Sequence, residues 1–481
     1  MVEVAREVET KYDVAPDFAV PTLSRPGRED TIDTVQLTST YHDTSELDLL
    51  RYRLALRRRE GDVDTGWQLK VPARRGRTEL RWPPSEGLPD ELAAQLRPFI
   101  RDRTLAEAVR LSVTRVRHRL CDGGGALLAE VALDDVRATG LSIAVRAPRW
   151  YEAEIELGPA GHDALLAEIG AMLTSAGAVP STSRSKLSRS VVGIGNEGVG
   201  TPRTSAGAVL VDYLSRQVDA VVAGHFAILQ DTDDEAVHRT RVACRRMRST
   251  LRTFEHCFDA EQAAAFEDEL RWYAGVLGGV RDAQVLRSRL LAAIDELPAD
   301  LVVGPITEQV DERLRSDLER HRAELLDAMR SDRYADLLSE ASRWRDHPPF
   351  TAAAGRPAET LHEAMDRVER TLGKRLRRAT RRSGTDEQMH RARKAGKRVR
   401  YAAEAAAAAG DDQAHQLAQD ITKLQDLLGE FQDSVVAAHL ARRLAEVAAE
   451  HGEDGFTYGV LVAEQRRHAD VARNRARRYR S

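Results

Sequence analysis

The feature that most constrains this chain is a pattern of basic residues that occurs twice, 152 positions apart. In each copy a histidine is followed by arginine or lysine at steps of three and four, which places them on one face of an α-helix. About forty residues later each copy has a similar hexapeptide, LGGVRD at 277–282 and LGEFQD at 428–433. Two matched elements at matched spacing predict a duplicated helical unit. The two stripes are His238, Arg241, Arg245, Arg248 and Arg252, and His390, Arg393, Lys397 and Arg400; Arg246 also recurs, as Arg398.

Like charges at i and i+4 on a helix repel, so the stripes need a partner. A solvated face with acidic neighbours usually explains a single stripe, and ion pairs to Asp282 and Asp433 would suit any function. Metal binding through His238 and His390 is the weaker alternative, because neither has a second His or Cys at ligand spacing. The duplication favours a basic groove for a polyanion. With 5% aromatic residues and no readout motif, a ligand that is all phosphate fits better than nucleic acid.

The periodicity of the sequence changes near residue 190. Before that point, segments with period-two alternation lie between Gly, Pro and Asp residues and predict strands, with helices only at 90–100 and 162–173. Residues 191–206 lack periodicity and are rich in small residues, which indicates a linker. Helical periodicity then continues to the end, with one strong break at 346–359. We therefore expect a multidomain α+β protein with domains 1–190 and 207–481, the second divided into halves 207–345 and 357–481.

The composition excludes several classes of protein. No N-terminal segment resembles a signal peptide, and no apolar run is long enough to span a membrane. The three cysteines form no metal-binding or disulfide pattern, which is typical of a reducing compartment. The net charge of −4 predicts no polyanion partner by itself, but 31% of the residues are charged and they are locally segregated. We expect a cytoplasmic protein without a membrane partner.

Charged residues of one parity recur along the predicted strands in chemically matched sets. Acidic sets occur in EVETK (7–11), EVALDD (130–135) and EAEIE (152–156), and basic sets occur in the strands between them. Because every second residue of a strand points to the same face, these sets predict either solvent-facing stripes or a barrel with a charged interior. In such a barrel the carboxylates would hold hard divalent cations, and the guanidinium and ammonium groups would hold phosphate oxygens.

EVETK resembles the ExExK signature of the CYTH family, the triphosphate tunnel metalloenzymes. The resemblance implies an antiparallel eight-stranded β-barrel, a tunnel that binds a triphosphate together with Mg²⁺ or Mn²⁺. It spans residues 1–190 and continues in the family's order through STYHDT (39–44), LALRRR (54–59), WQLK (67–70), EVALDD (130–135), YEAEIEL (151–157) and SRSKLSR (183–189).

Adenylate cyclases of the family have a His-Phe pair ahead of ExExK, where this chain has Met1 and Val2, and the difference favours a phosphohydrolase.

Carried over by position, this resemblance implies roles for the charged residues. Metal ligands would be Glu7, Glu9, Glu154 and Glu156, with Glu130, Asp134 and Glu152 as further acidic candidates. Catalysis would involve Glu7, Glu9, Lys11, Arg57, Arg59 and Lys70, and the substrate would also contact Arg115, Arg117 and Lys186.

The region that contains the two stripes resembles a CHAD domain, the conserved histidine α-helical domain. HRTRVACRRMRSTLRTF (238–254) and HRARKAGKRVRYAAE (390–404), each with its hexapeptide, match its two halves. The resemblance implies two four-helix bundles that bind inorganic polyphosphate through the nine stripe residues, with Lys394 as an alternative to Arg393. Asp282 and Asp433 would hold basic side chains in place, and Gln432 in place of Arg281 means that the halves need not bind equally. Further basic segments contain Lys374, Arg375, Arg377, Arg378, Arg381 and Arg382, and Arg473, Arg475, Arg477, Arg478 and Arg480.

Both domains point to a chain of phosphates as ligand, which leads to three hypotheses. The first is a metal-dependent triphosphatase or polyphosphatase whose helical domain captures polyphosphate. The second is a polyphosphate-binding protein with a slow or silent tunnel, placed on polyphosphate granules. The third is a nucleotide enzyme, either a cyclase or a nucleoside triphosphatase. The intact carboxylate and basic sets favour the first hypothesis over the second.

Overall fold

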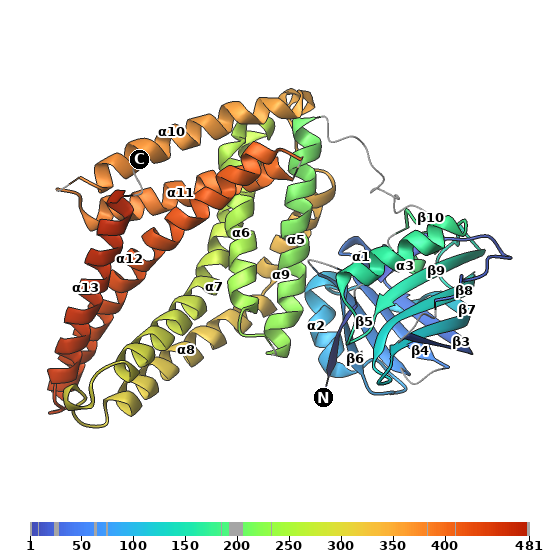
Figure 1. The fold of residues 1–481 in the computed structure, drawn as a ribbon, viewed down its shortest axis with the longest axis horizontal. Helices are drawn as coiled ribbons and strands as arrows, with labels where there is room; N and C mark the ends of the chain where they lie inside the picture. Colours follow the sequence, from blue (N-terminus) through green and yellow to red (C-terminus); the bar gives the residue numbers. More distant parts are fainter. Residues whose placement is uncertain are drawn as a thin grey trace. The chain divides into compact units, whose positions relative to one another are not determined.

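The computed structural model describes residues 2–7, 9–23, 28–61, 65–73, 76–183, 185–191, 205–231, 233–381, 383–408 and 410–478, without the side chains of residues 6, 7, 28 and 29. The chain divides into two compact units, residues 1–201 with 225–232, and residues 202–224 with 233–481 (Figure 1). Residues 192–204, most of the predicted linker, lie outside the described residues. Within the described ranges, no helix combines the length and the apolar character that crossing a membrane requires.

The first unit is built around an antiparallel sheet. Its strands are β1 (Glu3–Glu7), β2 (Glu9–Asp13), β3 (Arg28–Asp43), β4 (Ala55–Glu60), β5 (Gly66–Pro72), β6 (Arg77–Trp82), β7 (Ala106–Asp122), β8 (Leu127–Gly140), β9 (Arg149–Leu157) and β10 (Val179–Pro180). Among the described residues these ten strands follow the order β1-β6-β5-β4-β3-β7-β8-β9-β2-β10. Period-two alternation along each strand separates an apolar face from a charged face, as the sequence predicted.

The predicted count of eight strands is wrong, and the predicted closed barrel is not confirmed. The N-terminal segment forms two strands on either side of Val8, which lies outside the described residues. β1 pairs with β6 at one end of the order, whereas β2 pairs with β9 near the other end. The two-residue strand β10 adds to β2. One short stretch of chain therefore pairs with strands near both ends of the sheet.

Four helices accompany the sheet within the described residues: α1 (Asp48–Arg51), α2 (Asp90–Ile100), α3 (Asp163–Ser175) and α4 (Lys186–Ser190). The helices α2 and α3 confirm the two that periodicity predicted. The helices α1 and α4 are too short to show a helical period, so the sequence did not reveal them. Leu165, Ile169 and Leu173 of α3 pack with Ile155 of β9 in one buried cluster.

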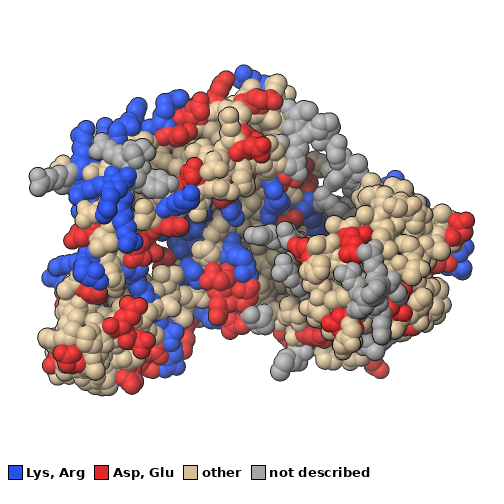
Figure 2. Space-filling model, in the orientation of Figure 1, with Lys and Arg blue, Asp and Glu red and all other residues tan. Residues whose placement is uncertain are grey.

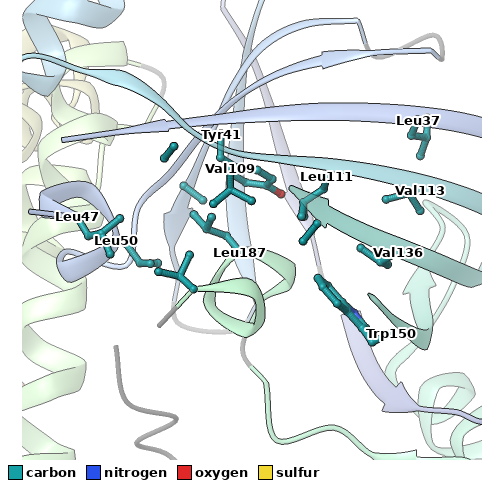
Figure 3. Packing of buried hydrophobic residues seen from close by; sticks show 14 residues of the cluster. Leu37, Tyr41, Leu47, Leu50, Val109, Leu111, Val113, Val136, Trp150 and Leu187 are labelled. Atoms are coloured by element: carbon teal, nitrogen blue, oxygen red, sulfur yellow. The ribbon is translucent and has the colours of Figure 1, made fainter. Parts of the chain in front are cut away.

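A second apolar cluster positions α4. Leu187 of α4 packs with Tyr41 of β3 and with Val109 and Leu111 of β7 (Figure 3). Burying a leucine of this kind contributes about 1.5–3 kcal/mol. A capping box between Ser185 and Ser188 begins the helix, satisfying backbone donors of its first turn. These interactions fix the backbone of the neighbouring Lys186.

The second unit is helical. Its helices are α5 (Ala206–Gln230), α6 (Ala236–Thr253), α7 (Ala260–Asp295), α8 (Ile306–Arg330), α9 (Asp332–Asp346), α10 (Leu361–Ala379), α11 (Asp386–Ala407), α12 (Asp412–Glu450) and α13 (Phe456–Arg478). Short 3₁₀ helices span Glu255–Cys257, Ala299–Leu301, Ala352–Gly355 and Ala358–Thr360.

The stripe-bearing helices α6 and α11 pack against each other, and each also packs on the following helix, α7 or α12. Apolar residues of α10 to α13, including Leu372, Val399 and Leu428, form the core of the second half. Within the described residues the first half has five α-helices and the second half has four. The predicted pair of four-helix bundles therefore stays a prediction, while the helical character of this unit is confirmed.

Candidate functional site

The charged strand faces of the first unit line a cavity of about 820 Å³. Most of the residues that were predicted for the tunnel lie around it, whereas the side chain of Glu7 lies outside the described residues. Sequence reasoning missed Arg81, which also lines the cavity. The charged lining residues are Glu9, Lys11, Arg57, Arg59, Lys70, Arg77, Arg81, Arg115, Arg117, Glu130, Glu154, Glu156, Asp163 and Lys186.

The cavity has a row of carboxylates on β8, β9 and β2 and a group of basic side chains on β4 and β5, although Lys11, Arg115 and Lys186 also lie among the carboxylates. Glu9 on β2, Glu156 on β9 and Glu130 on β8 stand in direct cross-strand register. Arg57 on β4 and Lys70 on β5 lie in neighbouring strands elsewhere in the order. Carboxylates directly opposite each other destabilise a sheet unless a cation balances them. The acidic row therefore attracts cations, and the basic wall attracts anions.

A second acidic group is already balanced by the protein itself. Among the described residues, Asp134, Glu152 and Glu154 form a group of three carboxylates whose possible ligand atoms lie within 4.8 Å of one another. The Lys186 ammonium lies 3.0, 2.7 and 2.6 Å from these three side chains. Burial alone would lower the pKa of Lys186, but the three carboxylates raise this pKa well above its usual value. A metal ion at this group would have to displace Lys186.

Glu154 links this group to the rest of the acidic wall. Its carboxylate accepts hydrogen bonds from Lys11 and, at 2.8 Å, from Arg115, in addition to the Lys186 contact. Burial alone would raise the pKa of Glu154, but Lys11, Lys186 and Arg115 hold it well below its usual value. Arg115 also donates two hydrogen bonds, of 2.8 and 2.7 Å, to Asp134. These five side chains form one network of ionised groups.

The carboxylates of Glu9, Glu130 and Glu156 line the cavity but, unlike those of Asp134, Glu152 and Glu154, are not gathered within 4.8 Å of one another in the described structure, so this row would hold a divalent cation only after its side chains move. Its carboxylate oxygens are the hard ligands that Mg²⁺ and Mn²⁺ prefer. Lys11 lies 3.1 Å from Glu9, and Arg119 lies 3.3 Å from Glu130, so cations of the protein already partly balance these two carboxylates. Burial would raise the pKa of Glu9, but Lys11, Lys70 and Lys186 together outweigh it and keep this pKa below its usual value. Of the predicted ligands, the structure thus places Glu9 and Glu156 in this row, and Glu154 in the group with Lys186.

The basic wall is organised by a buried carboxylate that sequence reasoning did not assign to the site. Glu79 of β6 is 1% exposed and lies 3.1 Å from Arg57, 3.4 Å from Lys70 and 2.6 Å from Arg81. Burial alone would raise the pKa of Glu79, but Lys70, Arg57 and Arg81 lower it below its usual value. The Nε of Arg57 also donates a 2.7 Å hydrogen bond to Gln68. Three cations are thus held in place before any ligand binds.

In the second unit, Arg246 and Arg398 occupy equivalent positions off the stripes, and their contacts explain why both halves have an arginine there. Arg246 of α6 donates a 2.8 Å hydrogen bond to Glu404 of α11. Arg398 of α11 donates a 3.1 Å hydrogen bond to Thr253 of α6 and another to the carbonyl of Arg252. These two contacts join α6 and α11 reciprocally and set the stripes side by side.

Lys397 lies where the two stripes come together. Burial, together with the nearby Arg245, Arg393, Arg241 and Arg400, lowers its pKa to about 6. Burial also lowers the pKa of Arg245. Within the described part of the chain, no carboxylate lies within ion-pair distance of Lys397. An anion bound here would relieve this repulsion.

The stripes also have counter-ions at their edges. Arg241 lies 2.7 Å from Asp282, and Arg393 lies 3.9 Å from Asp433, the two aspartates of the hexapeptides. Glu267 pairs with both Arg248 and Arg252. This geometry agrees with a supporting role for the aspartates.

The two histidines have different surroundings. The Nδ1 of His390 lies 2.8 Å from the side-chain oxygen of Gln432. Burial lowers the pKa of His238, and Arg281, at the position equivalent to Gln432, lowers it further. The two halves therefore present different charges beside their histidines.

Comparison with known proteins identifies both regions. The CYTH domain family model matches residues 5–190, and the CHAD domain family model matches residues 212–442. An uncharacterised protein of Mycobacterium tuberculosis (strain CDC 1551 / Oshkosh) is 34% identical over 490 residues, which cover 97% of this chain and 93% of that protein. This chain is a member of the CYTH–CHAD family. Its first unit therefore belongs to the triphosphate tunnel enzymes that the sequence suggested.

Two solved structures resemble part of this CYTH–CHAD chain. PptA from Streptomyces chartreusis is 23% identical and covers 57% of this chain and 99% of its own, with a TM-score of 0.50, which shows a shared fold over that part. The CHAD domain from the plant Ricinus communis is also 23% identical, covers 57% of this chain and 92% of its own, and has a TM-score of 0.44.

The basic segments outside the CHAD stripes have separate locations. Lys374, Arg375, Arg377 and Arg378 lie exposed on α10, and Arg381 is exposed just beyond its end. Arg473, Arg475, Arg477 and Arg478 lie on α13, where Arg473 pairs with Asp386. The predicted members Arg382 and Arg480 lie outside the described residues.

Proposed function

We propose that the cavity of the first unit is the active site of a metal-dependent phosphohydrolase for inorganic triphosphate or polyphosphate, and that the helical unit binds polyphosphate. The observation that carries this proposal is that one cavity is lined both by a row of carboxylates and by a set of guanidinium and ammonium groups. A condensed phosphate needs both, since its charges must be neutralised by fixed cations and by a divalent cation during hydrolysis.

In this mechanism the basic wall positions the phosphate chain. Arg57, Arg59 and Lys70 would bind non-bridging phosphate oxygens, and Glu79 would keep Arg57 and Lys70 in place so that little reorganisation accompanies the reaction. Glu9, Glu130 and Glu156 would hold the divalent cation, which when bound neutralises phosphoryl oxygens and lowers the pKa of a water molecule.

The cavity favours an inorganic substrate over a nucleotide. Tyr41 is the one aromatic side chain among the described residues that line the cavity, and its hydroxyl lies 3.5 Å from the Nη1 of Arg57. Nucleobases usually bind on aromatic stacking platforms. The hydroxyl of Tyr41, which faces Arg57, is instead suited to contact a phosphate oxygen.

Phosphate release by the full-length protein tests the catalytic proposal. The substrates are tripolyphosphate, long-chain polyphosphate and ATP, each with Mg²⁺ or Mn²⁺. We expect release from the inorganic substrates to exceed release from ATP, and the double variant Glu9→Gln, Glu156→Gln to lose at least ~100-fold in kcat. The control replaces two exposed carboxylates, Glu46→Gln with Glu107→Gln. Full activity in the cavity variant would contradict the metal assignment.

A separate binding measurement tests the helical unit. The variant Arg245→Gln, Arg393→Gln should weaken polyphosphate binding while tripolyphosphate hydrolysis in the cavity continues. Its control, Arg315→Gln with Arg320→Gln, removes two arginines that are exposed and paired with acidic residues of their own helix. Equal polyphosphate affinity of the stripe variant and this control would contradict the assignment of the stripes.

A further inference from the structure

The helix α10 carries a basic surface that the paired stripes do not include. Between Arg370 and Arg381 the sequence RTLGKRLRRATR contains no acidic residue. Arg370, Lys374, Arg378 and Arg381 follow one another at steps of four, four and three, so they share one side of the helical path, and all four are exposed. Figure 2 shows Lys and Arg side chains gathered over this part of the helical unit.

The cations of this surface lack the acidic neighbours that other exposed arginines have. Elsewhere in the unit, Arg315, Arg320 and Arg467 each pair with a carboxylate three or four residues away on their own helix. By contrast, the side chains of Lys374 and Arg378 make no ion pair with any described residue. Their mutual repulsion is therefore left to solvent and to a ligand.

The duplicated helix in the first half provides an internal comparison. The helix α5 precedes α6 as α10 precedes α11, but α5 contains one arginine, Arg216, and no lysine. Arg216 is paired with Asp212. The structural requirements of a helix at this position therefore do not explain the basic residues of α10.

The surface on α10 is connected to the stripes by further cations. Arg252 ends the stripe on α6, and Arg398 donates a hydrogen bond to the Arg252 carbonyl. Burial lowers the pKa of Arg398, and both Arg252 and Arg375 lower it further through their proximity. Arg375 of α10 in turn donates a 3.5 Å hydrogen bond to the carbonyl of Arg391. Cations thus continue from α6 across α11 to α10, with Glu267 pairing with Arg252 at the start of this path.

We propose that the exposed face of α10, with the adjoining end of α13, binds a second segment of a long polyphosphate chain whose first segment lies on the stripes of α6 and α11. This inference rests on the polyphosphate binding proposed above. Arg477 of α13 donates a hydrogen bond to the carbonyl of Arg381, so the end of α13 lies beside the end of α10. The proposed surface consists of the exposed Arg370, Lys374, Arg378, Arg381, Arg475 and Arg478.

Charge continuity favours one continuous polymer over a separate partner. A polyanion that already occupies the stripes would reach α10 past Arg398 and Arg375, which lie between the two surfaces together with Glu255 and Glu267. The helical unit would then select polyphosphate by length, because a short chain is fully neutralised by the stripes and only a longer one gains the contacts with α10.

Binding of tripolyphosphate and of long-chain polyphosphate to the full-length protein tests this inference. The variant Lys374→Gln, Arg378→Gln, Arg381→Gln replaces three exposed cations by glutamine, which is neutral and has good helix propensity. The control Arg315→Gln, Arg320→Gln, Arg467→Gln removes the same charge from arginines with acidic partners. The affinity for each ligand is measured over a range of salt concentrations, and thermal unfolding checks that both variants are folded.

We expect the α10 variant to bind long-chain polyphosphate roughly tenfold more weakly, with a salt dependence lower by about two in the logarithmic slope. Its tripolyphosphate affinity should equal that of the wild type, and the control should retain the long-chain affinity.

Unchanged long-chain affinity in the α10 variant, or an equal loss in the control, would overturn the inference but leave the stripe site standing. Failure of the wild type to bind any polyphosphate would instead overturn the proposed function of the helical unit, and this inference with it. Preferential binding of α10 to RNA or to anionic vesicles, measured in competition with long-chain polyphosphate, would also overturn the inference.

Discussion

The cavity of the CYTH unit and the stripes of the CHAD unit both concentrate cations, but they balance them differently. In the cavity, carboxylates such as Glu79 and Glu154 each contact three cations. In the stripes, Lys397 has four arginines as its main neighbours and no carboxylate within ion-pair distance in the described chain. A network that contains its own counter-ions is rigid before ligand binds, whereas a cluster without them is stabilised by the ligand.

This difference separates two kinds of phosphate site. Catalysis requires groups that are fixed in position, because reorganisation during the reaction raises the barrier. Capture of a polymer requires net attraction, which a cluster of uncompensated charge supplies over a longer range. The comparison can be tested from either side, by removing a counter-ion from the cavity or by changing the charge in the stripes.

The largest effect is expected on removing the carboxylate charge of Glu154. The variant Glu154→Gln leaves Lys11, Arg115 and Lys186 without their shared buried partner, which costs about 3–5 kcal/mol in the free energy of unfolding. Denaturant unfolding of the full-length protein measures this loss. The exposed variant Glu107→Gln should change stability by less than about 0.5 kcal/mol. A loss for Glu154→Gln as small as for the control would show that solvent screens the cavity network.

A smaller effect is expected when acid protonates the counter-ion of the basic wall. The pKa of Glu79 is lowered in the folded protein, so its stabilising contribution is complete above the unfolded value near 4.5 and is lost as the pH falls below it. Between neutral pH and about pH 3, the wild type should lose about 1–2 kcal/mol more than Glu79→Gln, whose side chain does not titrate. Parallel stability–pH curves for the two proteins would contradict the ionised state of Glu79.

The sequence predicted those parts of both sites that depend on position along one element. Parity along a strand placed Glu9 and Lys11 on one face, and the helical period placed His238 and Arg245 on one face. Both inferences need only the local backbone geometry, so they hold without knowledge of the tertiary fold.

The parts that the sequence did not predict depend on pairing between distant segments. Glu79 contacts Arg57 because β6, β5 and β4 pair in a particular register, and parity alone does not fix that register. Likewise, Lys186 reaches Asp134 from a five-residue helix that has no periodic signal. Two additional strands also arose from pairing, one because residues 3–13 divide between two neighbours and one because Val179–Pro180 pairs with β2.

The charge of Lys397 should make polyphosphate binding depend on pH. Its pKa is lowered to about 6 in the free protein, so the ligand-bound state takes up a proton at neutral pH. Affinity should fall by up to about tenfold per pH unit as the pH rises above 6, until the pKa of the bound state is reached. Lys397→Arg, whose charge is permanent, should show a weaker dependence and less proton uptake, measured from binding enthalpies in buffers of different ionisation heat.

Two observations would limit this interpretation of Lys397. The exposed variant Lys394→Arg should bind polyphosphate with the pH dependence of the wild type. If Lys397→Arg kept the pH dependence of the wild type, the titration would belong to another group near the stripes. Asp433, whose pKa is raised by burial, and His238, whose pKa is lowered by burial, are two such groups.

The smallest effect is the difference in stability contributed by the two reciprocal contacts between α6 and α11. Arg246 pairs with the charged Glu404, whereas Arg398 donates hydrogen bonds to the neutral Thr253 and to a carbonyl. The Arg246 bond has charge on both partners, whereas the Arg398 bonds have charge on the donor alone, so we expect Arg246→Met to cost about 1.5–3 kcal/mol and Arg398→Met about 0.5–1.5 kcal/mol in the free energy of unfolding. Denaturant unfolding of the two variants measures the difference. Equal losses would show that Arg400 and Tyr213, at 3.4 and 3.1 Å from Glu404, compensate for the missing guanidinium, because both already contact this carboxylate.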